Sequence, residues 1–489
     1  MSTFDERSVL SDEQRNKRYA VWLAAGLALV GLHVVLALLS PRFAYDADPL
    51  AMPVLALVAI LICAGVVYLL IACRPITGSA GRGLVVWMIA VGAVLRAIML
   101  PATPILETDF YRYLWDGAVV VRLQNPYAHS PEQVLSNTGA DRQIPTELHQ
   151  LADEAGATLG RINHPHLRTI YPPVAQAAFA AAYLIKPWSL VAWRVVLLAF
   201  DVAVLMLLIA TLRALGLSVM AAAVYWWNPL IVATIFNAGH MDLIAFPFVL
   251  GSLLLVMRNR YVSASGVLAV ALGAKLWPVI LLPIVLRPFL ARPARLAAAL
   301  LVFAAVGGVM LYPLVATGLD STSGLAVYSR SWQLNDALYK LFVWTAHAGL
   351  TLTGGQTYHS QLVARIAVAC VLVIWLVWLC RRAHASPCDL YQRCLLAVAA
   401  LFLLSPAQFP WYYTWLVPLL AVRPRFSLLL LTVLLPLYYL RYHLAARGHV
   451  ELFDYGVVWL EYVPVWCLLV YEAWQQRRRP TPVTANPPV

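Results

Sequence analysis

The sequence predicts an all-α protein that crosses a membrane many times. Of its 489 residues, 62% are hydrophobic and only 12% are charged, and the mean hydropathy is +0.75. Soluble domains carry about a quarter charged residues, so this composition excludes a soluble fold. Apolar segments long enough to cross about 30 Å of hydrocarbon recur along the whole chain. We therefore expect a bundle of about 12–14 transmembrane helices.

Each expected span is an apolar run bounded by charged or turn-forming residues. The runs at 262–275 and 277–290 are short and interrupted by proline, which leaves the exact number of spans open between twelve and fourteen. The expected spans are 19–39, 51–73, 83–100, 190–212, 217–236, 242–257, 262–275, 277–290, 296–316, 361–380, 394–408, 411–422, 426–443 and 457–475.

The basic residues predict the orientation of these spans. Cytoplasmic loops are enriched in Lys and Arg, and a cytoplasmic N-terminus places most of the short basic loops on that side. These loops contain Arg74, Arg82, Arg258, Arg260, Arg381 and Arg393. We expect an inner-membrane protein with cytoplasmic tails at 1–18 and 476–489. Between the tails, 19–475 would form a single transmembrane catalytic domain with long external loops at 101–189 and 317–360.

The net charge and the cysteines narrow the expected partners. The net charge of +12 is explained by the basic cytoplasmic loops, and no basic run accompanies a soluble module. Membrane lipids are therefore expected partners, and nucleic acid is not. The seven cysteines all lie outside the long polar insertion, which predicts neither a disulfide nor a cysteine metal site.

The insertion after residue 100 begins with a charged and aromatic cluster, ETDFYRYLWDGAVVVRLQNPY at 107–127. Charges this close to a membrane are costly, which favours a functional role. We expect one helix along the interface at 110–123 and a second at 174–185, the latter introduced by Tyr171 and two prolines. The candidate substrate-binding residues of the insertion are Glu107, Tyr111, Arg112, Asp116 and Tyr171.

Asp109 is the candidate catalytic residue of this cluster. An ionised carboxylate at the external surface can act as general base and accept a proton from an acceptor hydroxyl. The alternative is structural, because Asp109 directly precedes a helix and could be its N-cap. Asp116 also has a structural alternative, as the i, i+4 partner of Arg112.

Two further polar groups interrupt the apolar segments. His240 and Asp242, in NAGHMD at 237–242, could orient a substrate, bind a pyrophosphate-like group or hold a metal ion, or could simply cap a helix turn. Lys275 lies between two short apolar runs and needs a partner, for which an anionic lipid phosphate is suitable. The alternative for Lys275 is snorkelling to the headgroups.

Aromatic segments in the later external turns supply the remaining candidates. Arg330 could bind a phosphate and Trp332 could stack on a sugar ring. Trp411, in the segment SPAQFPWYY, could line a carbohydrate or lipid groove. An interfacial aromatic belt explains both segments equally well. Asp201, inside a predicted span, is expected to form a buried pair or to cap a neighbouring helix.

Four segments together resemble the polyprenol-phosphate-sugar-dependent membrane glycosyltransferases of the GT-C superfamily, and more narrowly their bacterial mannosyltransferase-like, family 87-type branch. The segments are 109–127 (DFYRYLWDG…NPY), 163–176 (NHPHLRTIYPPVAQ), 237–242 (NAGHMD), and 274–278 together with 405–412. The resemblance implies a first external loop with two juxtamembrane helices, and a catalytic acid that falls on Asp109. This chain departs from the family in having Thr108 where many relatives have a second acid.

The implied activity is transfer of a hexose, with mannose favoured, from a polyprenyl-phosphate donor to a glycan, lipid or protein acceptor of the cell envelope. A nucleotide sugar is cytoplasmic, whereas a lipid-linked sugar can enter the site from the bilayer. Inversion with Asp109 as base needs no cofactor, and a divalent metal is left open. The alternative is a polytopic transporter or flippase for a lipid-linked glycan, for which inverted repeats and broken helices would be expected.

Overall fold

The structure is a computed structural model that describes residues 12–74, 81–136 and 144–478. Within these ranges all regular secondary structure is helical, and nine helices are long and apolar enough to cross a membrane. A tenth span results if Val219–Trp226 and Ile231–Asn237, which are bent by 58° at their junction, count as one. The predicted all-α, multi-pass membrane fold is thus confirmed.

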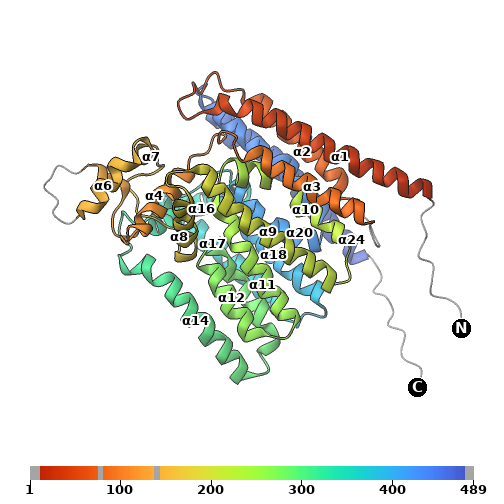
Figure 1. Cartoon of the computed structure of the whole chain (residues 1–489). Helices are drawn as coiled ribbons and strands as arrows, with labels where there is room; N and C mark the ends of the chain where they lie inside the picture. The colour runs from red at the N-terminus through yellow and green to blue at the C-terminus, as the bar shows by residue number, and fades with distance from the viewer. Residues whose placement is uncertain (1–11, 75–80, 137–143, 479–489) are drawn as a thin grey trace, which may run out of the picture.

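Three long N-terminal helices lie side by side along one edge of the molecule (Figure 1). The helix α1 begins within the predicted 1–18 tail, so the apolar span is extended by a polar first turn. The tail residues 1–11 lie outside the described residues. The elements are α1 (Asp12–Leu39), η1 (Ser40–Phe43), α2 (Val54–Ala72) and α3 (Arg82–Met99).

The long insertion is a folded unit and not an extended loop. Both helices expected in it are present, as α4 (Phe110–Val121) and α8 (Pro173–Ile185), and they pack against each other. The segment between them folds over α4 with a small apolar core of its own, centred on Trp115, Leu151 and Leu159. It contains α5 (Pro131–Leu135), α6 (Thr146–Ala155) and α7 (Ala157–Gly160).

The middle of the chain alternates long helices with short, broken ones. Four apolar helices, including α8, have only 10–17 residues, and this lowers the number of full-length spans below the predicted twelve to fourteen. The elements are α9 (Leu190–Ala214), η2 (Val219–Ala222), α10 (Ala223–Trp226), the π-helix η3 (Ile231–Asn237), η4 (Met241–Ala245), α11 (Phe246–Met257), α12 (Tyr261–Leu272), η5 (Trp277–Leu281), α13 (Leu282–Leu286), η6 (Arg287–Phe289) and α14 (Pro293–Ala316).

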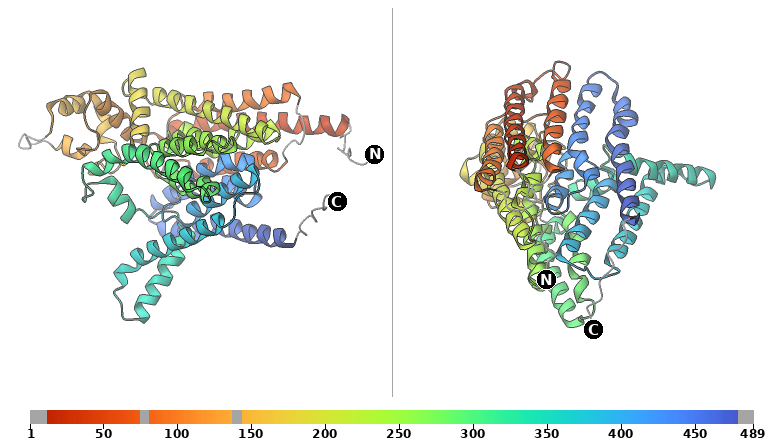
Figure 2. Two further views of the ribbon diagram at one scale, coloured as in Figure 1. Left: turned by 90° about the horizontal axis from the view of Figure 1, so that it is seen from below. Right: turned by 90° about the vertical axis from the view of Figure 1, so that its right-hand side faces the viewer.

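The segment 317–360, expected to be a loop, contains two helices. The second of these, α16, forms a hairpin with α17 that projects from the bundle (Figure 2). Lys340 and His347 interrupt its apolar run, which is why the sequence pattern concealed it. The elements are α15 (Gly324–Ser331), α16 (Ala337–Leu352), η7 (Thr357–His359), α17 (Ser360–Cys380) and α18 (Pro387–Leu404).

The C-terminal part begins with short helices around prolines and ends in a long span. The last helix continues to Arg478, beyond the predicted start of the tail at 476, and the tail residues 479–489 are outside the described residues. The elements are α19 (Pro410–Tyr413), η8 (Thr414–Leu416), α20 (Val417–Val422), α21 (Phe426–Leu434), η9 (Leu435–Tyr439), α22 (Leu440–Ala445), α23 (Val450–Leu452), the π-helix η10 (Phe453–Val457) and α24 (Val458–Arg478).

A buried ion pair ties α3 to α9 inside the bundle. Nε of Arg96 lies 2.7 Å from Oδ2 of Asp201, and both side chains are almost completely buried. Tyr225 donates to the other carboxylate oxygen, and Arg96 also donates to the carbonyl of Trp226. A buried charge without such partners would cost several kcal/mol. The expected buried pairing of Asp201 is confirmed.

The insertion and the chain ends lie at opposite ends of the molecule. Figures 1 and 2 show α4, α6, α7 and α8 gathered at one end, while the start of α1 and the end of α24 lie together at the other. The site described below lies at the end that carries α4 and α8.

Candidate active site

The segment that carries Glu107 and Asp109 is held in place by two polar side chains of other elements. Arg194 of α9 donates to the carbonyls of Leu100 (2.8 Å) and Ala102 (2.7 Å). Asn237 accepts from the amide of Ile105 (2.9 Å) and donates to the carbonyl of Thr103. Every one of these bonds satisfies a backbone group of the irregular segment. The two acids are therefore presented on a braced backbone.

The local backbone next to Glu107 is unusual. Leu106 has a φ of 59°, in the left-handed region that a non-glycine residue rarely adopts. Such conformations are retained where the surrounding structure holds them, often at functional sites. The braces on residues 102–105 supply that support here.

Asp109 is the N-terminal flanking residue of α4 but does not cap it. Its side chain makes no capping hydrogen bond and instead accepts from Nδ2 of Asn163 at 3.3 Å. Its Oδ2 also lies 3.5 Å from Nδ1 of His240. The N-cap alternative for Asp109 is therefore wrong, and the carboxylate is directed into a cavity.

His240 lies between the two acids. Its Nε2 is 3.8 Å from Oε2 of Glu107, so one imidazole faces both carboxylates. The ring is fully buried and stacks on Trp411, with the ring centroids 3.8 Å apart and the planes at 12°. Gly239 precedes it with a φ of 81°, and Trp193 donates to the Gly239 carbonyl at 2.7 Å. This turn fixes the position of the ring.

The surroundings of the two acids shift their pKa values in opposite directions. Burial raises the pKa of Glu107 well above its ordinary value and the Asp109 charge raises it further, against a weak contact from Tyr442. Burial also favours the neutral form of Asp109, but the polar contact and charge of His240, with smaller contributions from Asn163 and Lys275, outweigh it and lower the pKa. The surroundings therefore favour the ionised form of Asp109 and the protonated form of Glu107.

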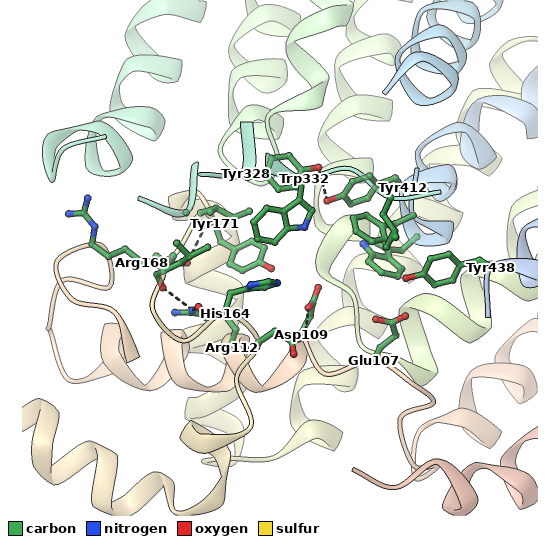
Figure 3. Close-up of a pocket in the computed structure, with 18 of the residues that line it drawn as sticks. Glu107, Asp109, Arg112, His164, Arg168, Tyr171, Tyr328, Trp332, Tyr412 and Tyr438 are labelled. Carbon is green, nitrogen blue, oxygen red and sulfur yellow. Dashed lines mark hydrogen bonds between the residues drawn. The ribbon is translucent and has the colours of Figure 1, made fainter. Parts of the chain in front are cut away.

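Glu107 and Asp109 line a cavity of about 290 Å³, here called the central chamber. Figure 3 shows Glu107 and Asp109 on one side of it, with Trp332 and Tyr412 facing them. Other lining residues are Arg112, His164, Arg168, Tyr171, Tyr328, Trp411, Tyr438, Arg441 and Tyr442. The chamber thus combines two acids with aromatic rings suited to a sugar.

A second cavity of about 600 Å³, the lateral groove, adjoins the chamber. Its walls are almost wholly apolar and come from α13, α17, α18 and the turn at 274–280. The groove and the chamber share Ile170, Tyr171, Tyr328 and Tyr412. An apolar chain lying in the groove would therefore have its end at the chamber.

Among the described residues, Lys275 is the one cationic side chain in the lining of the lateral groove. Its Nζ lies 2.7 Å from Oδ1 of Asp242 and 4.6 Å from the ring centroid of Tyr412. Trp415 donates to the same oxygen of Asp242 at 2.6 Å. Lys275 remains 19% exposed, whereas Asp242 is 1% exposed. Asp242 therefore pairs with Lys275, and is not the N-cap of the next helix, a position that His240 occupies.

Two other predicted site residues lie elsewhere. Asp116 is buried, lines neither the central chamber nor the lateral groove, and accepts from Thr169 (2.5 Å) and Gln176 (3.1 Å). Its expected i, i+4 pair with Arg112 is replaced by these bonds, and its assignment to substrate binding is corrected to a structural link between α4 and α8. Arg330 is exposed on α15 and lines neither the central chamber nor the lateral groove.

Arg112 and Trp332 do reach the chamber. Arg112 donates to the carbonyls of His164 (3.2 Å) and Leu167 (2.9 Å), so its guanidinium braces the chamber wall. The ring of Trp332 packs at a tilt against the rings of Tyr328 and His164. Tyr111 lies outside the chamber, in the cavity discussed further below, and its hydroxyl accepts from Arg161 at 3.3 Å.

Sequence reasoning missed Tyr438, Arg441 and Tyr442, which lie at the end of the expected span 426–443 and line the chamber. The available signal was Arg441 itself, since an ionisable residue inside a predicted span is a functional candidate.

In the described part of the chain no group of three or more His, Cys, Asp or Glu could hold a metal ion.

No family model, curated protein or solved structure matches this chain.

Proposed function

We propose that this protein is a membrane glycosyltransferase that moves a hexose from a polyprenyl-phosphate carrier to an acceptor hydroxyl, with Asp109 as general base. One observation carries the proposal: the ionised Asp109 faces a chamber that shares four residues with an apolar groove containing Lys275. That combination fits a substrate with a sugar, a phosphate and a long hydrocarbon chain.

The lateral groove is suited to the carrier lipid. Hydrocarbon gains about 25 cal/mol for each Å² of apolar surface that leaves water, and a groove lined by Leu372, Leu376 and Leu401 provides such contacts. Tyr412 and Tyr328, hydrogen-bonded to each other at 3.1 Å, stand at the junction with the chamber. The phosphate would lie at this junction, close to Lys275.

Lys275 is the candidate partner of the phosphate. Its contact with Asp242 holds the ammonium group in place and leaves part of it exposed to the groove. Negative charge develops on the leaving phosphate in the transition state, and a fixed cation beside it lowers the barrier. Asp242, Trp415 and Tyr412 act by positioning this ammonium group.

The reaction is a single displacement. The acceptor hydroxyl passes its proton to Asp109 while its oxygen bonds to the anomeric carbon. The bond from that carbon to the phosphate oxygen breaks, and its electron pair leaves with the polyprenyl phosphate. Attack in line inverts the configuration and requires one base and no covalent intermediate. Trp332 and Tyr171, in the chamber wall, are positioned to contact the sugar ring.

We also propose that the site faces the external side of the inner membrane. The basic loops at 74–82, 258–260 and 381–393 favour a cytoplasmic position for the opposite side. A donor on the external side is delivered by the bilayer, which is consistent with the apolar wall of the lateral groove.

A transporter of lipid-linked glycans is the second candidate, and one observation favours it. The pair Val219–Trp226 and Ile231–Asn237 is bent by 58° and leads directly to His240. Broken helices next to a polar site are typical of secondary transporters. Transport and transfer differ in what happens to the donor, so they can be separated experimentally.

The test uses the purified full-length protein in lipid nanodiscs with radiolabelled polyprenyl-phosphate hexoses and a membrane extract as acceptor. Transfer predicts release of polyprenyl phosphate together with label in the acceptor. Asp109→Asn should lower the rate by about 10²–10⁴. Asp153→Asn, an exposed acid of α6 in the same insertion, is the matched control and should retain the rate. An intact donor that crosses reconstituted vesicles would favour the transporter, and full activity of Asp109→Asn would refute the base assignment.

A further inference from the structure

A third cavity, of about 550 Å³, lies next to the central chamber and is here called the N-terminal cavity. Its walls come from the connection between α1 and α2, from the segment before α4, and from α22. Its polar and aromatic lining residues include Tyr45, Asp46, Tyr111, Arg161, Arg441 and Tyr442. None of these elements contributes to the lateral groove.

The central chamber connects the two outer cavities. It shares Glu107, Arg441 and Tyr442 with the N-terminal cavity. It shares a different set of residues with the lateral groove, and the two outer cavities have no residue in common. If the carrier lipid occupies the lateral groove, the N-terminal cavity is a separate approach to Asp109.

The charges of the N-terminal cavity do not cancel. Nη2 of Arg161 is 3.0 Å from Oδ2 of Asp46, so these two charges compensate each other. Burial raises the pKa of Glu107 well above its ordinary value, which favours the neutral form of that acid. Arg441 has no such compensation. Within the described part of the chain its guanidinium has no hydrogen bond or ion pair, and its buried Nε is an unsatisfied donor.

The buried Nε of Arg441 has no acceptor, and this desolvation cost would be offset by a bound anion. Guanidinium groups bind phosphate and carboxylate through two parallel hydrogen bonds. Tyr45, Tyr111 and Tyr442 line the same cavity and offer ring faces and hydroxyl groups for a sugar. The cavity is therefore matched to a polar ligand that carries a negative charge.

We infer that the N-terminal cavity binds the acceptor, and that the acceptor is a sugar-containing molecule with an anionic group that Arg441 binds. This inference rests on the proposed transferase function. The hydroxyl that reacts reaches Asp109 past Glu107, and the anionic group stays on Arg441. The connection between α1 and α2 thereby becomes a determinant of acceptor specificity.

The test measures binding of three small glycosides to the full-length protein in nanodiscs by equilibrium dialysis. Methyl glucoside is the neutral probe, and methyl glucoside 6-phosphate and methyl glucuronide are the anionic probes. The wild type should bind at least one anionic probe about ten- to a hundredfold more tightly than the neutral one, the range that a charge-assisted hydrogen bond gives. The two anionic probes distinguish phosphate from carboxylate.

Two variants locate the charge. Arg441→Gln should abolish the preference for the anionic probe, and Arg441→Lys should retain part of it because the charge remains without the planar fork. Arg447→Gln, an exposed arginine six residues further on, is the matched control and should keep the full preference. Equal binding of neutral and anionic probes by the wild type, or an undiminished preference in Arg441→Gln, would overturn the inference.

Carrier binding separates this inference from the proposed function. The same proteins are titrated with polyprenyl phosphate, and Arg441→Gln should bind it as the wild type does. A loss of carrier binding in Arg441→Gln would assign Arg441 to the donor phosphate and overturn the acceptor assignment. If the wild type neither binds the carrier nor consumes the donor but keeps an Arg441-dependent anion preference, the transferase function fails while the anion site stands.

Discussion

Nδ1 of His240 lies 3.5 Å from Oδ2 of Asp109, on a ring that is fully buried and stacked against Trp411. The contact is one of the reasons that the pKa of Asp109 is lowered in spite of burial. The imidazole therefore keeps the proposed base ionised and fixes its direction. Loss of the ring should affect both properties.

His240→Gln should lower kcat by about 10- to 100-fold, with a smaller change in KM, because the base loses orientation and not substrate contacts. It should also move the acid limb of the pH–rate profile to higher pH, since only the smaller contributions of Asn163 and Lys275 then oppose the rise in the pKa of Asp109 caused by burial. The control is His166→Gln, an exposed histidine two residues after the chamber-lining His164. An unmoved acid limb would show that His240 serves packing alone.

The raised pKa of Glu107 leads to a prediction for the alkaline side of the pH dependence. Burial and Asp109 raise its pKa, so the native state binds the proton more tightly than the unfolded chain does. The stability contributed by this group is complete below its ordinary value of about 4.3 and is lost as pH rises through the raised value. Glu107→Gln keeps the side chain neutral at all pH values.

Glu107→Gln should therefore raise the melting temperature at pH 7–8 relative to the wild type while changing it little near pH 4. Turnover at pH 6–7 should persist, and any alkaline fall in activity caused by ionised Glu107 should disappear. Melting curves and initial rates between pH 4 and 9 check both statements. A strong loss of turnover at pH 6 would instead make Glu107 a second essential acid.

The components of the site were largely predictable from the sequence, but their contacts were not. Asp109, His240 and Lys275 stood out because a polar residue near or inside an apolar segment needs a reason. The pairing of Lys275 with Asp242, 33 positions earlier in the chain, depends on how two broken spans pack. Asp116 was misassigned to substrate binding because its partners, Gln176 of α8 and Thr169 just before that helix, lie more than 50 residues away in the chain.

Lys275→Gln should weaken binding of polyprenyl phosphate about tenfold or more, because a charge-assisted hydrogen bond is lost. It also leaves Asp242 buried without its cation, which is destabilising. The double variant Lys275→Gln/Asp242→Asn should recover the melting temperature but not the binding. Lys186→Gln, an exposed lysine at the end of α8, is the control. Normal carrier binding in the double variant would remove Lys275 from the phosphate site.

The hydrophobic pattern of the sequence predicted the long helices but not the short, proline-bounded ones. Long apolar helices such as α2 and α9 were predicted within three residues, because their length alone identifies a span. The prolines at 278, 283 and 288 divide one apolar region into η5, α13 and η6, and no single-window pattern gives those breaks. The helix α16 was missed because its polar residues resemble those of a loop.

The close approach of α4 and α8 gives a prediction about the scaffold. A Cβ atom on Gly117 would lie 2.3 Å from the carbonyl oxygen of Phe179, a backbone atom that cannot move without moving α8. Gly117→Ala should therefore separate the two helices and lower stability by about 1–3 kcal/mol. Since Asp109 precedes α4 and Tyr171 precedes α8, the same separation should lower the rate of sugar transfer.

Gly160→Ala is the matched control, because a Cβ atom at that position of α7 meets nothing within 4 Å. It should leave both the melting temperature and the rate close to the wild type. The comparison isolates the cost of helix separation from the general effect of replacing glycine in this insertion. If Gly117→Ala melts and reacts like Gly160→Ala, the tight α4–α8 contact does not position Asp109.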